Sequence, residues 1–244
     1  MSDVLALHLG PTGSATVMGP PPPKVVAIGD SLTYGYGDPV GGGWVDRLKR
    51  DWMSSTPSAP VLYNLGVRGD TIAQIHHRFE FEFQQRGELR HRPPQTLIFS
   101  FGVNDSARLG HSRGRHRTPF EAFQGHLGTL LDQACQLAQV LFVGMVPVDE
   151  RQMPFMDAFF LTQEDQYLYK EATRLACQER QVPYLDVFEI WRQRGADWLV
   201  QQLCDDGLHP NSRGYLHLYQ DIVHWPALER CFHGTLTSHN TTLG

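Results

Sequence analysis

The sequence has few cysteines and no motif that would use them. Its four cysteines lie far apart and form no C-x-x-C pair: Cys135, Cys177, Cys204 and Cys231. This spacing fits neither a disulfide framework nor a zinc site, so we expect a reducing, cytoplasmic location. The histidines also lack a neighbouring cluster of carboxylates or cysteines, so no metal is expected, and no cofactor is implied.

Long apolar runs and an excess of positive charge are missing as well. No apolar stretch approaches the ~20 residues that span a membrane, and the N-terminus lacks the basic segment of a signal peptide. The formal net charge of −5 gives no global attraction to nucleic acid. We therefore expect neither stable membrane insertion nor a nucleic-acid partner. Nothing in the sequence indicates the oligomeric state.

What is present suits one globular domain. The chain has 244 residues, of which 41% are hydrophobic and 19% charged, enough for a sizeable core. Residues 1–23 end in GPPPP and are rich in Gly, Pro, Ser and Thr, which predicts a flexible leader. Residues 231–244 are polar and non-periodic, which predicts a fraying tail. The predicted domain is therefore 24–230.

Short apolar segments alternate with helical patterns in this domain. Strands buried on both faces are expected at 25–29, 61–66, 96–102, 140–146 and 183–188. Helices are expected at 44–53, 71–85, 120–138, 163–181, 189–203 and 212–224. The alternation predicts a three-layer α/β/α domain with a parallel sheet of about five strands. A flavodoxin-like strand order, 2-1-3-4-5, would place the first three strands side by side.

Chemically useful residues follow these strands. Asp30 and Ser31 come directly after the first strand, Gly66 ends the second, and Asn104 follows the third. Ligands of such sheets bind beyond the carboxyl ends of the strands. We therefore expect Ser31, Gly66 and Asn104 to converge at one edge of the sheet, with Asp30 accepting backbone N–H groups at a helix start.

Asp206 and His209 lie three residues apart in the turn DDGLHPN. This spacing lets the carboxylate reach Nδ1 of the imidazole and leaves Nε2 free to take a proton from a serine hydroxyl. Asp205 is a weaker alternative partner for the imidazole. A tetrahedral intermediate would also need hydrogen-bond donors for its oxyanion, and Ser31 N–H, Gly66 N–H and the Asn104 amide are the candidates.

Four segments together resemble the blocks of the GDSL, or SGNH, hydrolase family: GDSL at Ser31, NLGVRGDT with Gly66, GVND at Asn104 and DGLHPN at His209. They occur in the family's order and extend over about residues 24–230. The resemblance implies a flavodoxin-like hydrolase fold and ester hydrolysis through an acyl-enzyme. It implies Ser31 as nucleophile, His209 as base and Asp206 as its partner, with Ser31, Gly66 and Asn104 in the oxyanion hole. A G-x-S-x-G elbow is absent around Ser31, which excludes the usual α/β-hydrolase.

Taken singly, these residues have simpler explanations: a helix cap for Ser31, a surface loop for His209 and a turn for Asn104. The predicted substrate-binding residues flank the nucleophile turn or lie in the segments 108–118 and 153–160: Tyr34, Tyr36, Trp44, Arg108, Phe155 and Met156. The basic segment 108–118 could instead be a solvated loop, and 153–160 could be core.

The predicted function is cleavage of small-molecule or lipid carboxylic esters, as in esterases, lipases and lysophospholipases. Three alternatives stay open at this point. The same site could serve acyl transfer or carbohydrate deacetylation, and the fold could be a binding module without catalysis.

Overall fold

The computed structural model describes residues 21–55, 59–86 and 92–236. The predicted leader therefore lies outside the described residues, apart from 21–23, and so does the end of the predicted tail. Residues 231–236 belong to the helix α10 (Pro226–Leu236), so the helical chain continues past the boundary expected at 230. None of the helices in these ranges is long and apolar enough to cross a membrane.

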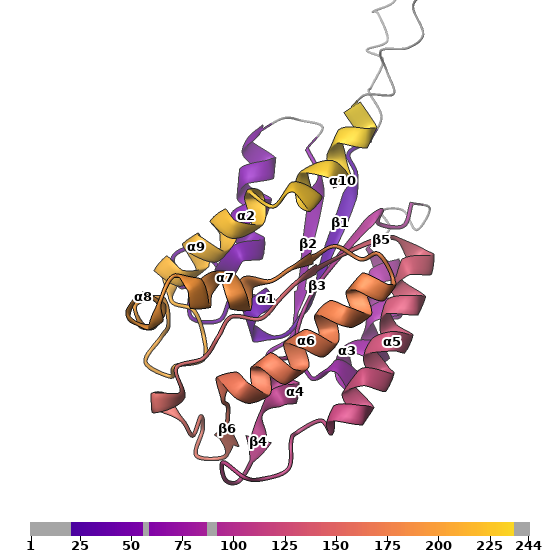
Figure 1. Cartoon of the computed structure of the whole chain (residues 1–244). Helices are drawn as coiled ribbons and strands as arrows, with labels where there is room; N and C mark the ends of the chain where they lie inside the picture. Colours follow the sequence, from indigo (N-terminus) through magenta and orange to yellow (C-terminus); the bar gives the residue numbers. More distant parts are fainter. Residues whose placement is uncertain (1–20, 56–58, 87–91, 237–244) are drawn as a thin grey trace, which may run out of the picture.

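A five-stranded parallel sheet forms the centre of the domain, with the order β2-β1-β3-β5-β7 (Figure 1). The strands are β1 (Lys24–Gly29), β2 (Val61–Gly66), β3 (Thr96–Ser100), β5 (Gln139–Val143) and β7 (Tyr184–Leu185). Every residue of β1 and β3 is buried, as expected for central strands covered on both faces. The predicted fold class and the order 2-1-3-4-5 are confirmed.

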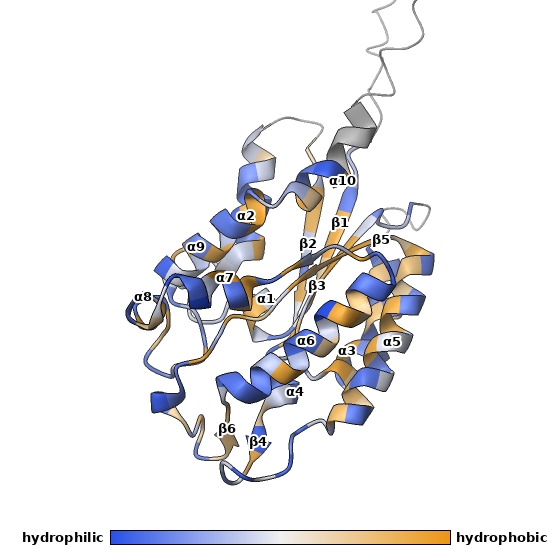
Figure 2. Cartoon of the chain, in the orientation of Figure 1, coloured by the Kyte–Doolittle hydropathy of each residue, from blue (hydrophilic) through white to orange (hydrophobic). Residues whose placement is uncertain are grey.

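Two groups of long helices cover the sheet (Figure 1). One group packs α3 on α5 and α5 on α6, and the other packs α2 on α9. Their bounds are α2 (Gly43–Ser55), α3 (Ile72–Gln85), α5 (Phe120–Leu137), α6 (Gln163–Glu179) and α9 (Ser212–Val223). In Figure 2 the central strands are largely hydrophobic, whereas the helices mix hydrophilic and hydrophobic residues. The helices therefore bury one face each on the sheet.

Several short elements were not predicted. They gather mostly at the carboxyl ends of the strands, at the opposite end of the sheet from α10 (Figure 1). They are α1 (Ser31–Tyr34), α4 (Val103–Ser106), a 3₁₀ turn (Glu150–Gln152), and the antiparallel pair β4 (Arg108–Leu109) and β6 (Phe159–Phe160).

The predicted strand 183–188 is shorter than expected. It ends at Leu185 because the Asp186 side chain accepts the Glu189 N–H and caps α7 (Val187–Gln193). The predicted helix 189–203 divides into α7 and α8 (Ala196–Val200) around a turn at 194–195. A side-chain cap therefore overrides the apolar pattern at this point.

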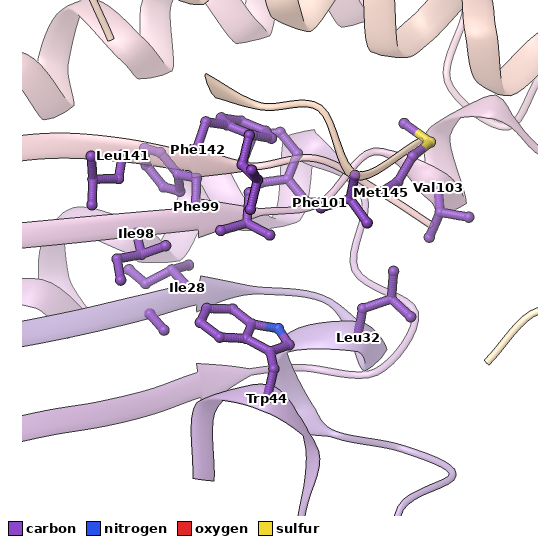
Figure 3. Close-up of a cluster of buried hydrophobic side chains, with 14 of the residues drawn as sticks. Ile28, Leu32, Trp44, Ile98, Phe99, Phe101, Val103, Leu141, Phe142 and Met145 are labelled. Carbon is purple, nitrogen blue, oxygen red and sulfur yellow. The ribbon is translucent and has the colours of Figure 1, made fainter. Parts of the chain in front are cut away.

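Trp44 belongs to the core, so its predicted role in substrate binding is wrong. Its side chain is 0% exposed and lies in the buried cluster that contains Ile28 and Leu32 (Figure 3). Trp44 is near the start of α2, on the side of the helix that packs inward. Its indole N–H has no hydrogen-bond partner in the described part of the chain. The residue fills space under the nucleophile turn and makes no contact with the cleft.

Candidate active site

Ser31 occupies the tight turn between β1 and α1. The carboxylate of Asp30 caps α1 by accepting the Leu32 N–H at 2.9 Å, as predicted. Because Asp30 takes the capping role, the Ser31 hydroxyl is free for another partner. The Ser31 side chain emerges beyond the carboxyl end of β1, the edge at which parallel sheets bind ligands.

That partner is His209. Its Nε2 lies 2.9 Å from Ser31 Oγ, across 178 residues of sequence. Its Nδ1 lies 2.7 Å from Asp206 Oδ2. The second oxygen, Asp206 Oδ1, accepts the backbone N–H groups of Leu208 and His209, both at 2.9 Å. Serine hydroxyl, imidazole and carboxylate thus form one continuous hydrogen-bonded chain.

The environment of Asp206 keeps its carboxylate ionised. Burial alone would raise its pKa, but the hydrogen bonds from the His209 ring and from two backbone N–H groups outweigh burial and hold the pKa below its ordinary value. An ionised Asp206 holds the imidazole proton on Nδ1 and leaves Nε2 as the acceptor facing Ser31. Asp205, the alternative partner, is exposed to solvent.

Two aromatic rings contact the imidazole. Tyr36 and Phe155 contact His209 edge-on, with ring centroids 4.6 and 5.7 Å away. The Arg68 guanidinium lies over the Tyr36 ring, 3.9 Å from its centroid. The structure therefore brings Tyr36 and Phe155 to the site, as predicted, and adds Arg68, which sequence reasoning missed.

Two adjoining hollows open at this point. The first, of about 250 Å³, is bordered by Ser31, His209 and Arg68. The second, of about 200 Å³, is lined mainly by apolar side chains, among them Ala107, Phe159 and Leu161. Both hollows share five bordering residues: Gly69, Asn104, Phe155, Met156 and Leu208. The predicted pocket residues Phe155 and Met156 therefore do lie at the cleft.

Tyr34 does not lie at the cleft. It is the last residue of α1, its side chain is 53% exposed, and it borders neither hollow. The short helix turns this ring outward, although it is only three residues from Ser31 in sequence. Its predicted role in substrate binding is therefore not supported.

Gly66 is also misplaced for its predicted role. Its backbone N–H donates to Asn64 Oδ1 at 3.0 Å, and it borders neither hollow. A Cβ atom at this position would lie 2.1 Å from the backbone nitrogen of Tyr34. Position 66 is therefore glycine because α1 packs directly against the end of β2. The prediction that the Gly66 N–H is an oxyanion donor is wrong.

Gly69, three residues further along, borders both hollows. Its φ of 80° lies in the left-handed region, which glycine adopts without strain. Within the described ranges, its N–H donates to no protein acceptor. The segment NLGVRGDT contains two glycines, and only Gly69 lies beyond the strand end, which is the signal that could have identified it.

Asn104 lies in α4, just past the end of β3. Its Nδ2 donates to Asp70 O at 3.0 Å and makes a longer contact of 3.4 Å with Asp30 Oδ2. Burial, together with the charges of Asp105 and Asp70, raises the pKa of Asp30 to about 7. One N–H of the Asn104 amide is therefore firmly bound to Asp70 O. The other makes only a weak contact with the carboxyl group of Asp30, whose raised pKa disfavours its ionised form.

Arg108 is held away from the cleft, which contradicts its predicted role. Its guanidinium forms a two-pronged ion pair with Asp165 of α6, at 2.7 and 2.6 Å, and borders neither hollow. The pair fastens β4 to α6. From the same basic segment, Arg117 does border the apolar hollow, and it donates to Gly69 O at 2.8 Å.

Within the part of the chain that the structure describes, no group of three or more His, Cys, Asp or Glu side chains could hold a metal ion. The site that these residues form has the parts of a serine hydrolase: a hydroxyl, an imidazole oriented by a carboxylate, and nearby N–H donors.

Comparison with known proteins identifies the family of the chain. The model of the GDSL-like lipase/acylhydrolase family matches residues 27–216. The chain belongs to the GDSL-like lipase/acylhydrolase family, and it is a carboxylic ester hydrolase. No curated protein matches the chain.

Solved structures share the fold. The lipase/acylhydrolase from Enterococcus faecalis is 24% identical, with a TM-score of 0.65, over 82% of this chain and 93% of that chain. The psychrotrophic esterase EstA from Pseudoalteromonas sp. is 17% identical, with a TM-score of 0.62, over 86% and 98%. The acetylxylan esterase Axe2 from Geobacillus stearothermophilus is 15% identical, with a TM-score of 0.60, over 83% and 93%.

Proposed function

We propose that the protein hydrolyses small carboxylic esters through an acyl-enzyme on Ser31, with His209 as general base and Asp206 as its partner. The observation that carries this proposal is the hydrogen-bonded chain from Ser31 Oγ through His209 to Asp206, with distances of 2.9 and 2.7 Å. This chain can deliver the serine proton to Nε2 while Asp206 stabilises the resulting imidazolium.

In the first half of the reaction, Ser31 Oγ bonds to the ester carbonyl carbon and His209 Nε2 takes the hydroxyl proton. The tetrahedral intermediate then collapses, the bond to the alcohol oxygen breaks, and His209 returns the proton to that oxygen. In the second half, water attacks the acyl-enzyme with His209 again as base. The carboxylic acid leaves and Ser31 recovers its proton.

The oxyanion would be held by the N–H groups of Ser31 and Gly69 and by the Asn104 amide. Ser31 opens a helix, and the first N–H groups of a helix have no acceptor within it. Asn104 can release its 3.4 Å contact with Asp30 to reach an oxyanion. Each such donor is worth roughly 10²–10³ in rate.

The hollows suggest which part of the ester lies where. Gly69 and Asn104 border both hollows, and because the second is lined mainly by apolar side chains, we assign the acyl group to that hollow. Its volume of about 200 Å³ lies below the ~300–1,000 Å³ typical of drug-sized ligands, which favours short acyl chains. The alcohol portion would leave on the side of His209.

These side chains supply the nucleophile, base and donors, so the proposal needs no cofactor. It includes a reducing, cytoplasmic location, since all four cysteines are free thiols. Acyl transfer or carbohydrate deacetylation would use the same machinery, and no contact in the site favours either of them over hydrolysis.

The test is hydrolysis of p-nitrophenyl esters of increasing acyl length by the wild type and by Ser31→Ala. Ser54→Ala, which alters an exposed serine, is the matched control. We expect the best rates on short acyl chains, with activity and fluorophosphonate labelling lost only in Ser31→Ala. If the wild type neither hydrolyses these esters nor reacts with the fluorophosphonate, the result would favour the alternative of a binding module without catalysis.

A further inference from the structure

The cleft is positively lined, although the chain as a whole carries a net charge of −5. Among the described residues that border the two hollows are two arginines, Arg68 and Arg117, and no aspartate or glutamate. The charged side chains at its border are therefore cationic, which favours an anionic group in the cleft.

The two arginines differ in what they bind. Arg117 donates to Gly69 O at 2.8 Å and so fastens the loop that carries an oxyanion donor. Arg68 forms no hydrogen bond or ion pair with any described residue. All of its N–H donors are available to a ligand, and a guanidinium presents them in a planar fork that matches a carboxylate or a phosphate.

Stacking holds Arg68 in a defined place. Its guanidinium lies over the Tyr36 ring, and Tyr36 in turn contacts the ring of His209. Arg68 also borders the hollow that contains Ser31 and His209, and not the apolar hollow. The unpaired cation therefore lies on the side where His209 returns a proton to the departing alcohol.

We propose that Arg68 binds an anionic group on the alcohol portion of the ester. The substrates are then short-chain acyl esters of alcohols that carry a carboxylate or a phosphate. This inference rests on the proposed ester hydrolysis at Ser31 and specifies the substrate class of that same site.

The basic segment 108–118 does not supply this cation. Arg108 is paired with Asp165, and Arg117 is bound to Gly69 O. Arg113 and Arg115 are exposed and border neither hollow. Arg113 is therefore a suitable control for the loss of one exposed positive charge outside the cleft.

The experiment compares three acetate esters that share one ring. In para-acetoxybenzamide the alcohol portion is neutral, whereas para-acetoxybenzoate and para-acetoxyphenyl phosphate carry the two kinds of anion. A fourth ester, p-nitrophenyl hemisuccinate, places the anion on the acyl portion. Steady-state kinetics are measured for the wild type, Arg68→Gln, Arg68→Lys and Arg113→Gln at low and high salt.

We expect Arg68→Gln to raise KM for the esters with an anionic alcohol about ten-fold, which corresponds to about 1.4 kcal/mol. Their kcat should stay within about two-fold, because a remote charge contact is made equally in the ground state and the transition state. Arg68→Lys should recover part of the loss. Arg113→Gln should change nothing. High salt should raise KM for the esters with an anionic alcohol in the proteins that keep a cation at position 68, and should have little effect on KM in Arg68→Gln.

Three results would overturn the inference. Equal losses on the benzamide and the anionic esters would mean that Arg68 only supports Tyr36 and His209. Unchanged kinetics in Arg68→Gln would mean that it binds no anion. A loss confined to the hemisuccinate would place the anion on the acyl portion. Ser31→Ala is measured on the same four esters. If none of them is hydrolysed in a Ser31-dependent way, the proposed function is refuted, and this inference with it.

Discussion

Replacing Asp206 by Asn isolates the role of one carboxylate with little disturbance of the fold. Asn keeps an oxygen in the place of Oδ1, which accepts the backbone N–H groups of Leu208 and His209. In the place of Oδ2 it puts an N–H group, 2.7 Å from His209 Nδ1. Nδ1 must then become an acceptor, so the imidazole proton moves to Nε2, and Nε2 can no longer take the proton of Ser31.

This change of tautomer should lower kcat about 10⁴-fold, or about 5 kcal/mol of transition-state stabilisation. The free energy of unfolding should change by less than about 1 kcal/mol, because both backbone hydrogen bonds survive. Asp206→Ala loses these two bonds as well, so it should be less stable by about 2 kcal/mol at a similar kcat.

The assay is the acylation burst with p-nitrophenyl acetate, read beside urea unfolding of the same samples. Asp205→Asn is the matched control, since it removes an adjacent, exposed carboxylate. An Asp206→Asn enzyme within about ten-fold of the wild-type kcat would refute the tautomer argument. A comparable loss in Asp205→Asn would transfer the role to the neighbouring carboxylate.

Three further predictions test the core beneath this site. Gly66→Ala puts a Cβ 2.1 Å from Tyr34 N and should destabilise the fold by about 1–3 kcal/mol in urea unfolding; a variant as stable as the wild type would refute this packing argument. The pKa of Asp30 is raised from 3.8 to about 7 in the fold, so its contribution to stability is fully present below pH 3.8 and is lost as pH rises through 7. Asp30→Asn should remove a fall in unfolding free energy of about 3 kcal/mol between pH 4.5 and 7.5, and equal slopes in both proteins would contradict the buried-carboxyl argument. Trp44→Phe should leave KM unchanged for every ester, since the indole lies in the core; a selective rise in KM would return Trp44 to the pocket.

The sequence predicted the sheet well because its signals are local or periodic. Strands buried on both faces show as nearly continuous apolar runs, and a parallel sheet with covered faces has few workable orders. The sequence also predicted hydrogen bonds between residues that are close in sequence. Asp206 and His209 are three residues apart, and Asp30 caps a helix that begins at the next residue.

The errors fall where a side chain's surroundings come from distant segments. Trp44 and Tyr34 both flank the nucleophile turn in sequence, yet packing buries one in the core and turns the other outward. Arg108 looks like a free surface cation until Asp165, 57 residues away, is placed beside it. The apolar or charged character of a side chain alone does not predict whether it lies in the core, at the cleft or on the surface.

The sequence by itself therefore determined the α/β/α architecture, the family and the pairing of Asp206 with His209, since each depends on short-range patterns of hydrophobicity and hydrogen bonding, whereas the contact of His209 with Ser31 spans 178 residues and depends on the fold. Only the tertiary structure decided which glycine faces the cleft. Gly66 and Gly69 are both glycine and lie three residues apart. However, α1 packs against Gly66, whereas Gly69 borders the cleft together with Ser31 and Asn104. That choice follows from how β1, β2 and their loops pack together, which local sequence does not encode.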